Sequence, residues 1–121
     1  QKIISKKLAN SVHDISSGGI LVALSEMCIS GNVGAKIKIP IKNIDANRYL
    51  FGEDQSRYLI EISEKNRLEV CKILEKNSIY YEIIGKTQKD SLDLEKNFNI
   101  TLSDLSKFNS FWFRNYFNET F

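Results

Sequence analysis

The sequence is poor in the residues that mark several large classes of protein. Among its 121 residues are only two cysteines, Cys28 and Cys71, which form no CxxC pair, so we expect reduced thiols and neither a disulfide framework nor a zinc site. The formal net charge is only +2, and no basic run with interleaved aromatic residues occurs, which argues against a nucleic-acid partner. No apolar run is long enough to span a membrane. We therefore expect a cytoplasmic protein.

What is present is the composition of an ordinary globular chain. Hydrophobic residues make up 42% of it and charged residues 26%, which is enough apolar material for one core. The predicted organisation is a single domain over residues 1–121. The chain begins with Gln1 rather than Met, and this favours a fragment of a longer, multidomain polypeptide.

Hydrophobic periodicity predicts an α/β (α+β) fold. Apolar residues recur at helical spacing in some segments and alternate with polar residues in others. We expect the strands over residues 35–41, 57–63 and 79–84 to share one mixed sheet, with helices packed on one face. The other predicted elements are a polar helical segment over residues 1–10, a strand over 11–15, a helix from Gly18 to the stop signal Gly31-Asn32, a helix over 67–77, a hairpin over 91–95 and 98–102, and a last helix begun by a capping box of Thr101 and Asp104.

The most informative stretch is SVHDISSGGILVALSE, residues 11–26. A glycine pair between a strand and a helix lets the backbone approach a ligand, and the first amides of a helix favour an anion such as phosphate. Just upstream, the Asp14 carboxylate could hold a divalent cation, the Ser16 hydroxyl could contact a phosphate oxygen, and His13 could donate to the same group. The alternative is structural: Ser16 or Ser17 caps the helix, the glycines form a turn, and His13 is hydrogen-bonded in the strand.

A second polar cluster lies in LFGEDQSRY, residues 50–58. Glu53, Asp54 and Gln55 follow a glycine and precede Arg57, which leads directly into an apolar strand. Such a cluster is well placed for a site at the mouth of a strand. A solvated loop with a surface ion pair is the alternative.

Together the two stretches resemble the C-terminal domain of the synthetase subunit (subunit II) of phosphoribosylformylglycinamidine synthase, from purine biosynthesis. The resemblance covers residues 11–62, with weaker support from Ile84-Gly85 and the aromatic C-terminal segment. Aminoimidazole ribonucleotide synthetase, selenophosphate synthetase and thiamine-monophosphate kinase share this type of domain, but GEDQSRY is most similar to the amidine synthase. The resemblance implies the fold of the aminoimidazole ribonucleotide synthetase C-terminal domain.

For the parent enzyme, the resemblance implies an ATP-dependent ligase. Formylglycinamide ribonucleotide is phosphorylated on its amide oxygen, and ammonia derived from glutamine displaces the phosphate to give formylglycinamidine ribonucleotide. The implied cofactors are ATP and Mg²⁺. The implied partners are the other domains of the parent chain, a glutaminase subunit and a small bridging subunit, with no nucleic acid and no membrane.

The resemblance also suggests roles for individual residues. Asp14 matches a position that can ligate magnesium, and Ser16 one that can contact nucleotide phosphate, in long single-chain relatives where this pocket is an auxiliary nucleotide site. In shorter, multi-subunit enzymes the pocket is structural. Ser17 stands where an acidic residue is usual, which removes one carboxylate from the metal side. The resulting candidates are His13, Ser16, Ser17, Gly18, Gly19 and Arg57 for nucleotide or phosphate, Asp14 for metal, and Glu53 and Asp54 for a site loop.

No catalytic residue is predicted. Phosphoryl transfer needs a positioned nucleotide, metal and acceptor, and the chain has neither a P-loop nor a Ser-His-Asp arrangement, so we expect it to be inactive on its own. The alternatives are a structural or dimerisation module without ligand contacts, and the equivalent domain of another superfamily member such as aminoimidazole ribonucleotide synthetase.

The last segment, residues 108–117, is rich in aromatic side chains. On a helix they would form more than one stripe, and one face of a small domain cannot cover them all. We expect Phe108 and Trp112 to pack inside the domain, and Phe113 and Phe117 to face a neighbour.

Overall fold

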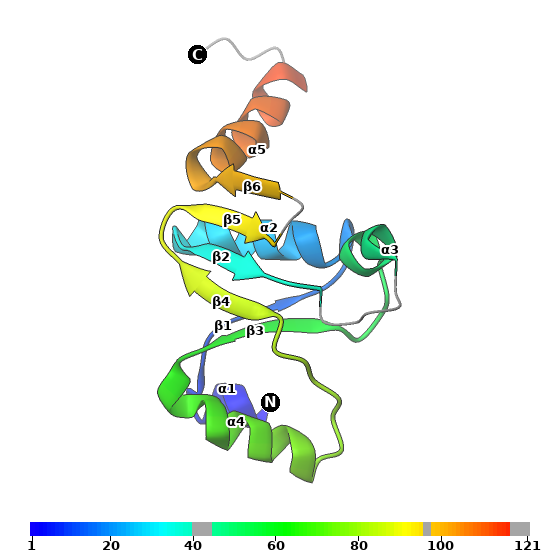
Figure 1. Ribbon diagram of the computed structural model, residues 1–121, viewed down its shortest axis with the longest axis vertical. Helices are drawn as coiled ribbons and strands as arrows, with labels where there is room; N and C mark the ends of the chain where they lie inside the picture. Colours follow the sequence, from blue (N-terminus) through cyan, green and yellow to red (C-terminus); the bar gives the residue numbers. More distant parts are fainter. Residues whose placement is uncertain (40–44, 96–97, 117–121) are drawn as a thin grey trace. The chain divides into compact units, whose positions relative to one another are not determined.

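The computed structural model describes residues 1–39, 45–95 and 98–116 (Figure 1). They fall into two compact units. The first comprises Gln1–Leu24 and Pro40–Ile83, and the second Ser25–Ile39 and Ile84–Phe121. Helix α2 (Gly19–Gly31) contributes residues to both. None of the helices in the described ranges has the length and apolar character needed to cross a membrane.

The first unit is built on a two-stranded antiparallel ribbon of β1 (Ala9–Asp14) and β3 (Tyr58–Ile62). Its helices are α1 (Lys2–Ser5), α3 (Ala46–Phe51) and α4 (Glu64–Lys76). The side chain of Asp45 accepts a hydrogen bond from the Arg48 amide at 3.0 Å and so caps the start of α3. An apolar cluster of Ile3, Leu8 and Val70, the α1–α4 cluster, forms a small core next to the ribbon.

The second unit contains a four-stranded sheet in the order β4-β2-β5-β6. The strands are β2 (Gly34–Ile37), β4 (Gly85–Gln88), β5 (Ser91–Leu94) and β6 (Phe98–Thr101), followed by α5 (Leu102–Tyr116). Strand β2 runs parallel to β5, and the other two pairings are antiparallel, so the sheet is mixed. Its buried side chains come from alternate positions of β2 and β5: Ala35, Ile37, Leu92 and Leu94.

The α/β class and the mixed sheet are thereby confirmed. So is the late hairpin, because β5 and β6 pair antiparallel. The predicted pairing of Thr101 with Asp104 at the start of α5 is present as well, with Thr101 as the cap. The Asp104 amide donates to the Thr101 hydroxyl at 3.1 Å, and that hydroxyl donates to the Asp104 carboxylate at 2.7 Å.

The expectation that residues 35–41, 57–63 and 79–84 share one sheet is wrong. Strand β2 belongs to the four-stranded sheet and β3 to the ribbon, while residues 79–84 form no strand. Residues 79–84 are held by side-chain hydrogen bonds instead: Tyr49 and Tyr80 both donate their hydroxyls to the Glu82 carboxylate. Residues 40–44, which include the end of one predicted strand, lie outside the described ranges.

The predicted helix over residues 1–10 is also shorter than expected. Helix α1 ends at Ser5, and Lys7 adopts a positive φ of 55° before the chain enters β1 at Ala9. A non-glycine residue in this region of φ/ψ space cannot continue a right-handed helix.

The expectation for the aromatic tail is wrong at Phe108. Its side chain lies on α5 and is 69% exposed, not packed inside the domain. Phe111 and Tyr116 on the same helix are exposed as well. The side chains of Trp112, Phe113 and Phe117 lie outside the described part of the chain, and the predictions for them remain predictions.

Candidate functional site

The antiparallel ribbon brings the two polar motifs together. The C-terminal end of β1 lies beside the start of β3, with Asp14 opposite Tyr58. One residue further on, the Ile15 amide donates to the Arg57 carbonyl oxygen at 2.9 Å. Residues 13–19 and 53–58 therefore meet at one end of the first unit.

The loop that follows Ile15 turns through its glycine pair. Gly18 and Gly19 have positive φ angles of 81° and 72°, and the Gly19 amide donates to the Ser16 carbonyl oxygen at 3.1 Å. A Cβ on Gly19 would lie 2.6 Å from the Leu50 carbonyl oxygen and 2.7 Å from the Phe51 Cα. The glycine thus allows the start of α2 to approach the backbone at the end of α3.

An internal carboxylate sits at the start of α2. The Gly18 amide donates to Oε1 of Glu53 at 2.8 Å. The Gly18 amide is therefore not open to an external anion while this hydrogen bond is in place. The physical reason given for an anion still holds, because the first amides and the dipole of a helix favour negative charge, but the anion at this amide belongs to the chain itself. Ser16 and Ser17 are exposed.

His13 and Asp14 lie at the end of β1 on opposite faces of the ribbon. The Nδ1 atom of His13 is 2.6 Å from the Asp14 carbonyl oxygen, which fits a donated hydrogen bond, and 3.9 Å from Oδ1 of the same residue. The His13 ring is mostly buried, whereas the Asp14 side chain is 69% exposed. The Asp14 carboxylate is thus open to solvent at the mouth of the ribbon.

Arg57 is held in place by a neighbour from its own loop and by one from α3. Its Nη1 atom is 3.0 Å from Oδ2 of Asp54, and its guanidinium lies over the ring of Tyr49, 5.5 Å from the centroid. The Asp54 side chain is exposed, so solvent screens this ion pair. Stacking on a buried ring gives the guanidinium a defined position next to the loop.

Sequence reasoning missed Tyr49 and Glu82. The Tyr49 side chain is only 8% exposed, and its hydroxyl lies 3.5 Å from Oε2 of Glu82. Burial, followed by the nearby Glu82 carboxylate, raises the pKa of Tyr49 to about 12. Tyr49 directly precedes the LFGEDQSRY motif, which is a signal for its position, but nothing in the local sequence marks Glu82 as its acceptor.

The side chains near this loop limit the kind of metal ion that could bind. Within the ranges that the structure covers, no group of three His, Cys, Asp or Glu side chains is placed to hold an ion. An all-protein cage therefore does not fit. A single open carboxylate at Asp14 does fit Mg²⁺, because that ion is usually held by one or two carboxylates together with phosphate oxygens and water.

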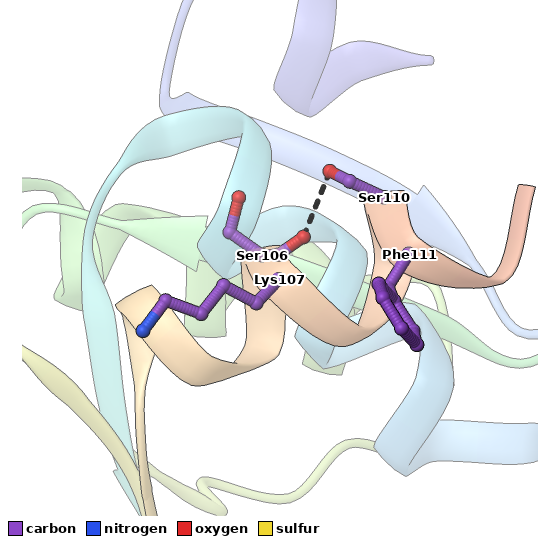
Figure 2. Close-up of a pocket in the computed structure, with 4 residues that line it drawn as sticks. All are labelled: Ser106, Lys107, Ser110 and Phe111. Atoms are coloured by element: carbon purple, nitrogen blue, oxygen red, sulfur yellow. Dashed lines mark hydrogen bonds between the residues drawn. The ribbon is translucent and has the colours of Figure 1, made fainter. Parts of the chain in front are cut away.

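Helix α5, in the second unit, carries a shallow hollow. It has a volume of about 280 Å³ and is lined by Ser106, Lys107, Ser110 and Phe111 (Figure 2). The Ser110 hydroxyl donates to the Ser106 carbonyl oxygen at 2.9 Å, as the dashed line in Figure 2 shows. All four lining residues come from one helix, and the Lys107 ammonium is paired with the Asp104 carboxylate at 3.7 Å. We therefore do not treat the hollow as a candidate for catalysis.

Comparison with known proteins gives one family and a consistent group of relatives. The family model described as "AIR synthase related protein, C-terminal domain" matches residues 1–96. The phosphoribosylformylglycinamidine synthase subunit PurL of Pelagibacter ubique is 43% identical over 115 residues, covering 95% of this chain and 16% of that protein. The subunit of the same name from Methylocella silvestris is 37% identical over 116 residues, covering 96% of this chain and 16% of that protein.

Solved structures share the fold. The Thermotoga maritima PurL complexed with FGAR superposes with a TM-score of 0.73 at 17% identity, over 87% of this chain and 19% of that one. The T. maritima PurL complexed with ATP gives the same score and identity over 20% of its chain, and the PurLQS structure from that organism matches at 18% identity. The chain spans about one-sixth of the length of the curated relatives it matches.

Proposed function

This chain belongs to the family described as AIR synthase related protein, C-terminal domain, and we propose that it is the C-terminal domain of a phosphoribosylformylglycinamidine synthase. The observation that carries the proposal is the 43% identity to PurL over almost the whole chain. The parent enzyme takes formylglycinamide ribonucleotide, ATP and ammonia, and releases formylglycinamidine ribonucleotide, ADP and inorganic phosphate. The γ-phosphoryl group moves to the amide oxygen, and ammonia then replaces it at the carbon.

The parent would work with partners in the cytoplasm. A PurLQS structure exists for T. maritima, which supports a glutaminase subunit as the source of ammonia and a small bridging subunit. The chain contributes one domain to this assembly, and the other domains of the parent supply most of the ATP and ribonucleotide sites. We therefore expect the isolated chain to be inactive.

The Asp14 site would hold a nucleotide phosphate together with Mg²⁺. Asp14 offers one open carboxylate to the metal, and phosphate oxygens would complete its coordination. The hydroxyls of Ser16 and Ser17 are exposed on the same loop, and the amide of Gly19 is already used within the loop. Bound Mg²⁺ would neutralise phosphate charge and fix the orientation of the nucleotide.

Two further residues would take part from the sides of the loop. Arg57 uses Nη1 for Asp54, and a guanidinium has five N–H donors, so it can also reach a phosphate. His13 at the end of β1 would contribute its other ring nitrogen, Nε2, because Nδ1 is already hydrogen-bonded to the Asp14 carbonyl oxygen. A phosphate that is to reach the Gly18 amide must first displace the Glu53 carboxylate, which accepts from that amide at 2.8 Å.

A scaffold role is the second candidate, and the same contact favours it. The Glu53 carboxylate already occupies the Gly18 amide, and Gly19 is tightly packed against the backbone of Leu50 and Phe51. In this role the two motifs hold each other in place, and the parent binds its nucleotide elsewhere.

The test uses the full-length parent protein. With formylglycinamide ribonucleotide, ATP and ammonium chloride, it should release formylglycinamidine ribonucleotide and ADP in equal amounts. A parent that instead consumes formylglycinamidine ribonucleotide would be an aminoimidazole ribonucleotide synthetase, contrary to the proposal.

The site is tested separately by calorimetry of nucleotide binding with Mg²⁺. Asp14→Ala should abolish binding at this site, and the matched exposed carboxylate variant Asp90→Ala should leave it unchanged. If Asp14→Ala binds as the unmodified parent does while synthesis is retained, Asp14 is not a ligand and the scaffold role is correct.

A further inference from the structure

The two faces of the β1–β3 ribbon are covered unequally. Neighbouring residues along a strand point to opposite faces, so Leu59 lies on one face and the cross-strand pair Val12 and Ile60 on the other. Leu59 is buried, whereas Val12 is 41% exposed and Ile60 is 38% exposed. The first face is packed at Leu59, and the other is apolar and open at Val12 and Ile60.

The open face runs from the core of the first unit to the candidate site. Ile62, two residues beyond Ile60 on the same face, packs against the α1–α4 cluster. In the other direction Tyr58 is 63% exposed and pairs with Asp14. The apolar cover thus stops between Ile62 and Ile60. We call the uncovered residues Val12, Tyr58 and Ile60 the ribbon patch.

The ribbon patch has the character of a contact surface. Single exposed apolar residues are common, but Val12 and Ile60 face each other across the strands, and Tyr58 is next to Ile60 on the same face. Within the described ranges β1 and β3 pair only with each other. A two-stranded ribbon alone is marginally stable in water and gains stability when an apolar face is covered.

The length of the relatives indicates what covers the patch. The chain spans about one-sixth of the curated relatives, so most of a synthetase of that size lies outside these residues. We propose that the ribbon patch is an interface with a segment of the parent polypeptide outside these 121 residues, and that this segment brings apolar side chains against Val12 and Ile60, beside Asp14. The inference rests on the proposed function, because that function supplies the parent polypeptide.

Photo-crosslinking in the full-length parent tests the occupant. Tyr58 is replaced by p-benzoylphenylalanine, which keeps an aromatic ring at the position, and Glu64 on α4, also exposed, is replaced in the same way as a control. After irradiation the Tyr58 variant should keep the mass of one parent chain, and its crosslinked peptides should map outside the 121 residues. The Glu64 variant should give little crosslink.

Several results would overturn the proposal. A band at the mass of two parent chains would make the patch an interface between copies, and a crosslink to an added glutaminase or bridging subunit would make it a subunit interface. Crosslinks that map within the 121 residues, or no crosslink at Tyr58 above the Glu64 background, would also contradict it. Synthesis of formylglycinamidine ribonucleotide is measured independently, so failure of the interface and failure of the proposed function are distinguishable.

A pair of charge substitutions gives a second readout in the same parent. Val12→Lys places a charge on the ribbon patch, and Ser11→Lys places one at the adjacent, exposed position on the opposite face. The melting temperature should fall for Val12→Lys and stay unchanged for Ser11→Lys. Equal melting temperatures for the two variants would show that solvent, not protein, meets the patch.

Discussion

Replacing Gly19 by alanine should destabilise the chain strongly. Gly19 has a φ of 72°, and an added Cβ would lie 2.6 Å from the Leu50 carbonyl oxygen and 2.7 Å from the Phe51 Cα. Both neighbours are backbone atoms of α3, which cannot move away as the end of a flexible side chain can. A left-handed backbone costs an alanine about 1–2 kcal/mol, and overpacking of this kind costs about 1–3 kcal/mol. The free energy of unfolding should therefore fall by about 2–5 kcal/mol.

Gly31→Ala is the matched control for this change. Gly31 is the last residue of the same helix, and nothing lies within 4 Å of the position of its Cβ. Alanine has a higher helix propensity than glycine, so this variant should be neutral or more stable by up to about 1 kcal/mol.

Urea unfolding followed by far-ultraviolet circular dichroism measures both variants on the same chain. The two variants should move the free energy of unfolding in opposite directions or differ by at least about 2 kcal/mol. If Gly19→Ala unfolds within about 0.5 kcal/mol of the unmodified chain, the loop is not clamped against α3 and the reasoning fails.

Three further predictions concern Tyr49, Ser78 and Ser63. Tyr49 has a folded-state pKa of about 12, above the usual value of about 10. The stability that depends on its neutral form is therefore fully present at pH values below about 10. Up to about 3 kcal/mol should be lost as pH rises through the folded pKa. The pKa values of Tyr80 and Tyr81 are raised as well, so in unfolding measured against pH Tyr49→Phe should make the decline of stability with pH smaller rather than remove it. Ser78 follows α4 with a φ of 53°, so Ser78→Gly should raise the free energy of unfolding by about 1 kcal/mol. In the same urea titration Asn32→Gly should raise the free energy of unfolding by less, because asparagine tolerates this conformation. The Ser63 hydroxyl precedes α4, is buried and has no hydrogen-bond partner in the described part of the chain, so Ser63→Ala should be neutral or stabilising, and a loss of about 1 kcal/mol would show that it acts as a cap.

Local features of the fold were predictable because their causes are local. The Thr101 cap and Asp104 are three positions apart, and β5 and β6 pair as a hairpin of strands that are neighbours in the sequence. The grouping of strands into sheets was not predictable in the same way. Alternation shows which residues of a strand share a face, but it does not name the partner strand. Residues 79–84 alternate well enough to suggest a strand, yet Glu82 is used as an acceptor for tyrosine hydroxyls.

The site was predictable to a similar extent. The glycine pair and the polar residues around it were recognisable, because a strand, a tight turn and a helix in succession have a clear sequence pattern. The partner of the Gly18 amide was not, since Glu53 is 35 positions away in the chain. Its contact depends on the pairing of β1 with β3 and on the approach of α3 to the loop. Such long-range side-chain contacts leave no local pattern to read.

The hydrogen bond between Gly18 and Glu53 is the physical difference between the two candidate functions. A hydrogen bond with one charged partner contributes about 1.5–3 kcal/mol, and a phosphate brought to the same amide would also meet the negative charge of Glu53. Phosphate and Glu53 therefore exclude each other at Gly18 unless the side chain of Glu53 moves away or a cation lies between them. Asp14 faces solvent at the same end of the ribbon, where it can supply one ligand to such a cation. A nucleotide site at this amide thus requires that Glu53 move away or that a cation separate its carboxylate from the phosphate, whereas a scaffold requires only that Glu53 stay where it is.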